Sequence, residues 1–209
     1  MGVLESALQP RIIKSSKLLT VTLPMEGDLP QSRRELEMLS TTLGESEVFE
    51  LLEENACIAN VRKAMEEYSF VHFACHGEQN QVDPTQSALL LSHGTHLTLE
   101  DIVKLKLPHA QLAFLSACQT ATGDTKLPEE YIHLAAGMLV AGYQSVIAIM
   151  WSIQDEDGPI VAKEFYQYLW KDMKPDVRQS AYALHHAVEK LRMQSKSFLQ
   201  WVPFIHMGV

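Results

Sequence analysis

Residues 68–77 read YSFVHFACHG, and residues 111–118 read QLAFLSAC. Each stretch begins with an apolar run about the length of one strand and ends on a residue with reactive chemistry, His76 or Cys118. Strands that are apolar on both faces are typical of a parallel sheet covered by helices on two sides. In such sheets the chemistry gathers at the carboxyl ends of the strands. The two stretches therefore predict a buried sheet with His76 and Cys118 at one edge.

The rest of the chain alternates between strand-like and helix-like segments. Besides 68–75 and 111–116, we expect strands at 17–23, 48–52, 145–151 and 201–207, and a hairpin over 88–98. We expect helices over 30–43 with Gly44 as its C-cap, 55–68, 99–105, 128–141, 158–170 and 176–193, the last capped by Asp176. This order predicts one three-layer α/β domain over residues 17–209, with about six strands, the central ones parallel, after a lead-in segment over 1–16.

The charge balance disfavours binding to nucleic acids. The chain of 209 residues has a net charge of −9, and its basic residues form no stripe that could follow a phosphate backbone. Between Glu26 and Glu67 there are eleven acidic and four basic residues. We expect these acids on solvated faces, which is where carboxylates usually lie.

Cysteine content and hydropathy predict a soluble, cytoplasmic protein. Three cysteines without a Cys-x-x-Cys motif are typical of a reducing compartment, where a single thiol can matter for its reactivity. Residues 1–20 lack the apolar core of a secretory signal. The apolar run 134–151 is interrupted at Gly142 and continues with β-branched residues, so it predicts a helix, a turn and a buried strand rather than a membrane span.

His76 and Cys118 together suggest nucleophilic catalysis. They lie 42 residues apart, which is enough for a hairpin, a helix and a return strand, so they emerge at the same edge if their strands are neighbours. A thiol nucleophile needs a nearby base or acid and donors for the oxyanion. The N–H groups of Gly77 and Cys118 are suited to that second task. Taken alone, a histidine and a cysteine after strands are more often packing residues, so this pattern leaves both interpretations open.

Four longer blocks strengthen the catalytic interpretation. FVHFACHG (70–77), LAFLSACQTATGD (112–124), LAAGMLVAGYQSVIAIMWSIQDEDG (134–158) and FLQWVPFIHMG (198–208) resemble, in order, the blocks of a CHAT domain. That caspase-like domain often follows tetratricopeptide repeats and is related to separase. The sequence of these blocks is most similar to that of the fungal members of the family. The resemblance implies a three-layer caspase-like fold and an intracellular cysteine endopeptidase, with His76 as catalytic histidine and Cys118 as nucleophile. It implies no cofactor, a protein or peptide substrate, and control by repeats or a sensor region outside this chain.

The block after the 145–151 strand bears on specificity. In separase-like relatives an aspartate at this place lines the S1 pocket and receives a basic P1 residue. Asp155 matches that aspartate best, and Asp157 is second. The alternative is structural, because Asp155, Glu156 and Asp157 come just before a helix, where anions are favoured as caps. The sequence leaves these two roles for Asp155 evenly balanced.

Other functions find less support. His72 and His76 would lie about 13 Å apart on a strand, too far to share one zinc ion. Cys75 adjoins His76 but faces the opposite side of the strand, which predicts a core residue. No phosphate-binding G-x-x-x-x-G-K-[ST] motif is present. The remaining alternative is a non-catalytic interaction module that keeps the caspase-like fold for assembly.

Overall fold

A computed structural model describes residues 13–23, 30–78, 80, 82–116, 129–151, 153–154, 156–172, 174–194 and 197–209. Within these residues six strands form one sheet in the order β2-β1-β3-β7-β8-β9. Their bounds are β1 Leu18–Thr22, β2 Val48–Leu52, β3 Phe70–Ala74, β7 Leu112–Leu115, β8 Ser145–Ile149 and β9 Phe204–Gly208. The first five are mutually parallel, and β9 is antiparallel to β8. The predicted α/β class and mainly parallel sheet are confirmed.

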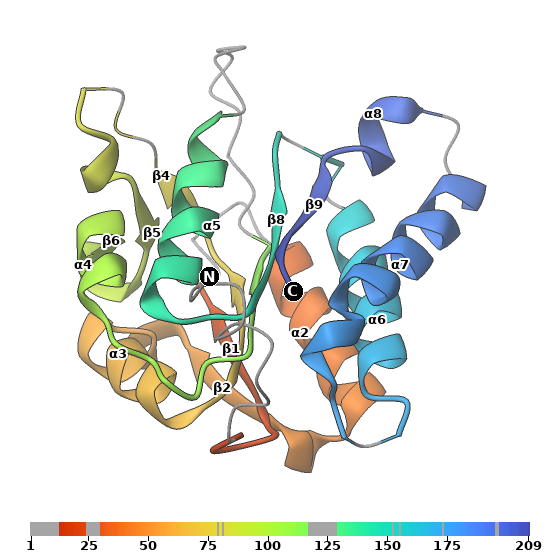
Figure 1. Ribbon diagram of the computed structural model, residues 1–209, viewed down its shortest axis with the longest axis horizontal. Helices are drawn as coiled ribbons and strands as arrows, with labels where there is room; N and C mark the ends of the chain where they lie inside the picture. Colours follow the sequence, from red (N-terminus) through yellow and green to blue (C-terminus); the bar gives the residue numbers. More distant parts are fainter. Residues whose placement is uncertain are drawn as a thin grey trace, which may run out of the picture.

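Helices cover both faces of this sheet (Figure 1). One face packs against α3 (Ile58–Glu67), α4 (Leu99–Lys104) and α5 (Glu129–Ala141). The other packs against α2 (Pro30–Leu43), α6 (Asp157–Leu169) and α7 (Ser180–Gln194). Every residue of β1, β3, β7 and β8 is buried, because each of these strands has a helical layer on both sides. The apolar runs of the sequence are therefore explained by two cores rather than one.

The segment that mimics a membrane helix folds as predicted, into α5, a turn and the buried strand β8. Gly142 makes the turn with a φ of 126°. A β-carbon there would lie 2.5 Å from the carbonyl oxygen of Leu107, so only glycine fits. No helix among the described residues is both long and apolar enough to cross a membrane.

A second, smaller sheet follows His76 at the carboxyl edge of the large one. It consists of β4 (Gly77–Glu78), β5 (Ala88–Leu90) and β6 (His96–Thr98) in that order, all antiparallel. The β5–β6 hairpin was predicted, but β4 was not, since a strand of two residues leaves no periodicity to detect. This sheet fixes the chain directly after His76.

Two expectations near the C-terminus need correction. Asp176 caps a short 3₁₀ turn over Val177–Gln179, and α7 starts only at Ser180. The last strand starts at Phe204 rather than Trp201, because the short helix α8 (Phe198–Trp201) precedes it. The stretch is mostly apolar, and such a run does not distinguish a strand from a short helix.

Candidate functional site

The two predicted catalytic positions follow neighbouring strands. Strands β3 and β7 pair in parallel, with Phe73 opposite Leu115, and the Ser116 N–H extends this ladder by donating to the Phe73 carbonyl over 2.9 Å. His76 comes three residues after Phe73, and Cys118 three residues after Leu115. Both segments therefore leave the sheet at the same level and the same edge. Cys118 itself lies outside the described residues.

His76 is held by backbone on its own side of the edge. It is buried, with an exposed fraction of 5%, and its carbonyl accepts a hydrogen bond of 2.8 Å from the Leu90 N–H. Gly77 pairs with Leu89 in the β4–β5 ladder. The bond from Leu90 to His76 shows that this is a non-hydrogen-bonded pair, so the ladder does not use the Gly77 N–H. The Gly77 N–H is therefore not used by the β4–β5 ladder, as an oxyanion donor requires.

Cys75 has the predicted core position. It is 2% exposed and belongs to the apolar cluster on the α3, α4 and α5 side of the sheet. Burial raises the pKa of its thiol to about 12, so almost no thiolate forms at neutral pH. Burial thus disfavours reactivity at Cys75 although it adjoins His76.

A buried polar cluster on the opposite side of the sheet was not predicted. Ser116 Oγ donates to the Glu35 carboxylate, at 2.9 Å from Oε1 and 3.0 Å from Oε2. His72 Nε2 lies 3.3 Å from Glu35 Oε1, and His72 Nδ1 lies 3.2 Å from the Tyr166 hydroxyl. Glu35 is only 4% exposed, so the expectation of solvated acids over 26–67 fails for this residue. A signal was present: Glu35 precedes the buried Leu39 by one helical turn and thus shares its face of α2.

Of the two predicted S1 aspartates, Asp157 is described and Asp155 lies outside the described residues. Asp157 is the first residue of α6 and is 5% exposed. Its Oδ2 atom is buried without a hydrogen-bond partner, while the Gln200 side chain and the Gln154 backbone hydrogen-bond the carboxylate. Burial is the main cause that raises its pKa, and the nearby Glu156 raises it further. Glu156 precedes α6 but makes no side-chain capping bond.

The block that contains Asp157 lies near the end of β7. A β-carbon on Gly158 would lie 3.6 Å from Ser116 Oγ and 3.6 Å from the side chain of Ile153. Helix α8 contacts the same block, because the Trp151 indole donates to the Leu199 carbonyl over 3.1 Å. The candidate specificity residue and the strand that leads to Cys118 therefore belong to one region, although they are about 40 residues apart in sequence.

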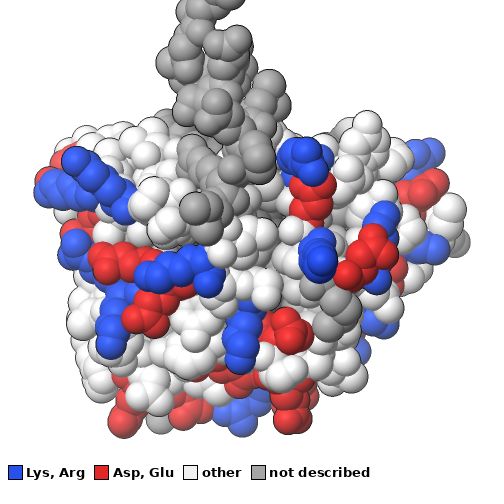
Figure 2. Space-filling model, turned by 60° about the horizontal axis from the view of Figure 1, so that its bottom comes forward, with Lys and Arg blue, Asp and Glu red and all other residues white. Residues whose placement is uncertain are grey.

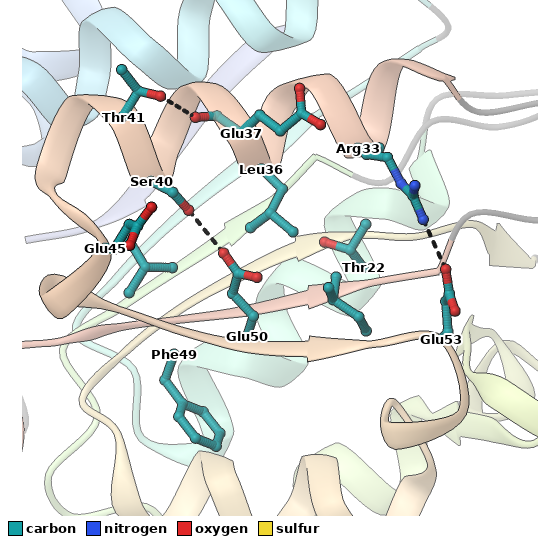
Figure 3. A pocket seen from close by; sticks show the side chains of 12 residues that line it. Thr22, Arg33, Leu36, Glu37, Ser40, Thr41, Glu45, Phe49, Glu50 and Glu53 are labelled. Carbon is teal, nitrogen blue, oxygen red and sulfur yellow. Dashed lines mark hydrogen bonds and ion pairs between the residues drawn. The ribbon is translucent and has the colours of Figure 1, made fainter.

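A cavity of about 790 Å³ lies elsewhere, between α2 and the edge strand β2 (Figure 3). Arg33 bridges to Glu53 and Ser40 bonds Glu50 across it. Its lining residues are Thr22, Arg33, Leu36, Glu37, Ser40, Thr41, Glu45, Val48, Phe49, Glu50, Leu52 and Glu53. None of the predicted site residues lines it. A charged side chain on an edge strand discourages pairing with other chains. This explains the presence of Glu50 on β2 without a role in binding.

The described residues contain no group of three or more histidine, cysteine, aspartate or glutamate side chains that could hold a metal ion. On the face shown in Figure 2, acidic and basic side chains are intermingled, and the basic ones form no continuous stripe.

The comparisons with known proteins agree with the architecture. The family model of the CHAT domain matches residues 7–209. The chain is similar in structure to separase of Saccharomyces cerevisiae in two crystal structures of the separase–securin complex, each with a TM-score of 0.60, at 16% and 15% identity. These matches cover 95% and 96% of this chain but only 12% of the separase chain. RgpB of Porphyromonas gingivalis, in a complex of its pro- and mature domains, matches with a TM-score of 0.57 at 14% identity, over 93% of this chain and 47% of that one. No curated protein matches in sequence.

Proposed function

The chain belongs to the CHAT domain family, and on this premise we propose that it is a cysteine endopeptidase with a His76–Cys118 dyad. The observation that carries the proposal is the pairing of β3 with β7. Phe73 and Leu115 are register partners, and the dyad residues follow them at the same distance along the chain. The likeness to separase and RgpB supports the caspase-like fold and leaves the chemistry to be tested on this chain.

The proposed reaction is an acyl transfer through the sulfur of Cys118. The thiolate attacks the carbonyl carbon of the scissile peptide, and the oxyanion that forms accepts hydrogen bonds from the N–H groups of Gly77 and Cys118. His76 gives a proton to the leaving amine as the C–N bond breaks. Water then hydrolyses the thioester, which releases the acid and restores the thiol. The Gly77 N–H that the β4–β5 ladder leaves unused supports its part in this scheme.

We further propose a basic P1 residue, received by Asp155 with Asp157 beside it. A carboxylate in a partly desolvated pocket pairs with a guanidinium through charge-assisted hydrogen bonds. The buried Oδ2 atom of Asp157, which has no hydrogen-bond partner, supports a carboxylate that can pair with a basic P1 side chain. Because the separase structures that this chain resembles are complexes with securin, we also propose control by a protein partner or by repeats outside this sequence.

The test is cleavage of fluorogenic peptides that carry arginine, lysine, leucine or aspartate at P1, with and without the natural partner. Cys118→Ala and His76→Ala should each abolish hydrolysis and leave the melting temperature within a few degrees of the wild type. Cys75→Ala is the matched cysteine control and should retain activity. A wild-type chain that stays inert with its partner, and whose Cys118 is not labelled by a peptidyl electrophile, would favour the non-catalytic interaction module.

A further inference from the structure

Four polar side chains, three of them buried and that of Ser116 half-buried, meet where β7 ends. Tyr166 comes from α6, His72 from β3, Glu35 from α2 and Ser116 from the first residue after β7. The chain of contacts runs from the Tyr166 hydroxyl to His72 (3.2 Å), from His72 to Glu35 (3.3 Å) and from Glu35 to Ser116 (2.9 Å). Tyr166 and His72 are at most 1% exposed, and Glu35 is 4% exposed.

Hydrogen bonds hold both ends of this cluster. The Tyr166 hydroxyl and His72 Nδ1 form one of them, while His72 Nε2 is buried beside Glu35 without a hydrogen-bond partner. The Ser116 hydroxyl donates to the same carboxylate, between its two oxygens. The Glu35 carboxylate therefore accepts from the residue that follows β7, while the His72 ring lies beside it on the core side.

Stability alone does not account for this cluster. Removing a carboxylate from water is costly, and apolar side chains of the same volume usually stabilise a fold at least as well. The surroundings are otherwise apolar and aromatic: the His72 ring centroid lies 4.9 Å from that of Phe114, in a tilted arrangement, and 5.6 Å from that of Tyr166, edge to face. What Glu35 adds, and a leucine would not, is a fixed direction for the Ser116 side chain.

Ser116 lies at the exit of β7, where the direction of its side chain affects the course of the chain. Its N–H makes the final described bond of the β3–β7 ladder, and the chain reaches Cys118 two residues later. Nucleophilic catalysis tolerates little displacement, and an error of about 1 Å costs on the order of a hundredfold in rate. We propose that Glu35 is a positioning residue that acts through Ser116 to hold the exit of β7, and with it the nucleophile Cys118. The proposal rests on the proposed function, since it takes Cys118 as the nucleophile.

The experiment measures alkylation of Cys118 by iodoacetamide, which needs no substrate. Cys57 is replaced by serine in every variant because it is partly exposed, while Cys75 is protected by burial. Ser116→Ala and Glu35→Ala break the bond from its two ends, and the double variant closes a mutant cycle. Glu35→Gln keeps an oxygen that can accept from Ser116. Leu39→Ala, one turn along the same face of α2, is the control for a general loss of stability.

We expect Ser116→Ala and Glu35→Ala each to slow alkylation at pH 7.5 by about tenfold, because a displaced thiol loses the imidazole that favours its thiolate. The double variant should be no slower than either single variant, and Glu35→Gln should recover most of the rate. Leu39→Ala should melt earlier but alkylate at the wild-type rate. With a cleavable peptide, kcat should fall and KM should stay unchanged.

Three results would overturn the positioning role: additive effects in the double variant, an unchanged rate in Ser116→Ala, or an equal slowing in Leu39→Ala. If Glu35→Ala does not fold, Ser116→Ala still decides the question. Failure of the proposed function looks different. In that case the wild type cleaves no peptide even with its partner, while the alkylation pattern still shows whether Glu35 positions Cys118.

Discussion

Asp157 offers a test in which stability and function should respond in opposite directions. Its carboxylate is buried at the start of α6, and Oδ2 has no hydrogen-bond partner. Burial raises its pKa, so the folded chain disfavours the ionised form relative to the unfolded chain. Asp157→Asn removes the charge and keeps an oxygen that can accept from Gln200. Relief of one unsatisfied buried charged acceptor corresponds to about 1 kcal/mol, or a rise of about 2–4 °C in melting temperature at this chain length.

The pH dependence provides the control. A raised folded-state pKa means that ionised Asp157 destabilises the fold fully above that raised value, and progressively less as pH falls toward the unfolded value of 3.8. In urea unfolding at pH 7.5, Asp157→Asn should therefore have a higher free energy of unfolding than the wild type, and this difference should shrink at pH 4. A variant that is less stable at pH 7.5 would refute the reasoning, because the anion would then serve α6 as a first-turn charge. If Asp157 also belongs to S1, the stabilised variant should lose cleavage after arginine.

Three further outcomes are expected. Cys75 should remain unmodified by iodoacetamide at pH 7.5 in mass spectra of the folded protein, whereas modification at the rate of Cys57 would contradict its buried position and its pKa of about 12. Gly142→Ala should lower the free energy of unfolding by more than about 2 kcal/mol, measured by urea, because its β-carbon would lie 2.5 Å from a backbone oxygen at a φ of 126°. Asp155→Ala should reduce kcat/KM for arginine at P1 by about 30- to 150-fold, and an unchanged P1 preference with about 1 kcal/mol less stability would assign it to capping.

The sheet could be predicted because the apolar composition of its strands indicates that they are buried. Residues 70–74 and 112–115 are buried on both faces, and only a central parallel strand with two helical layers explains such runs. That β3 and β7 end at one edge also follows, since parallel neighbours share one carboxyl edge. Strand β4 and helix α8 could not be predicted in the same way. Both are shorter than the period that would identify them, and their conformations depend on contacts made elsewhere in the fold.

Glu35 shows a different limit of the sequence. A glutamate among many acids is solvated in most chains, and that rule holds for its neighbour Glu37. The exception arises from partners on three other elements, which come from positions as distant as Tyr166 and meet only in the fold. Buried polar clusters of this kind depend on residues from several segments at once, so the sequence of one segment alone does not predict them. A glutamate on the apolar face of a helix is the local sign that deserves a search for such partners.

Under the proposed function, the arrangement around Ser116 predicts that specificity and catalysis are coupled. A β-carbon added to Gly158 at the start of α6 would lie in van der Waals contact with the Ser116 hydroxyl, and Asp157 is the preceding residue. Helix α6 also carries Tyr166, which anchors the other end of the buried polar cluster. A shift of α6 that moves Asp157 would therefore strain the bond between Ser116 and Glu35. Because contacting residues rarely act additively, substitutions at Asp157 and Ser116 should show a measurable interaction energy in kcat/KM, whereas Asp157 and Leu39 should not.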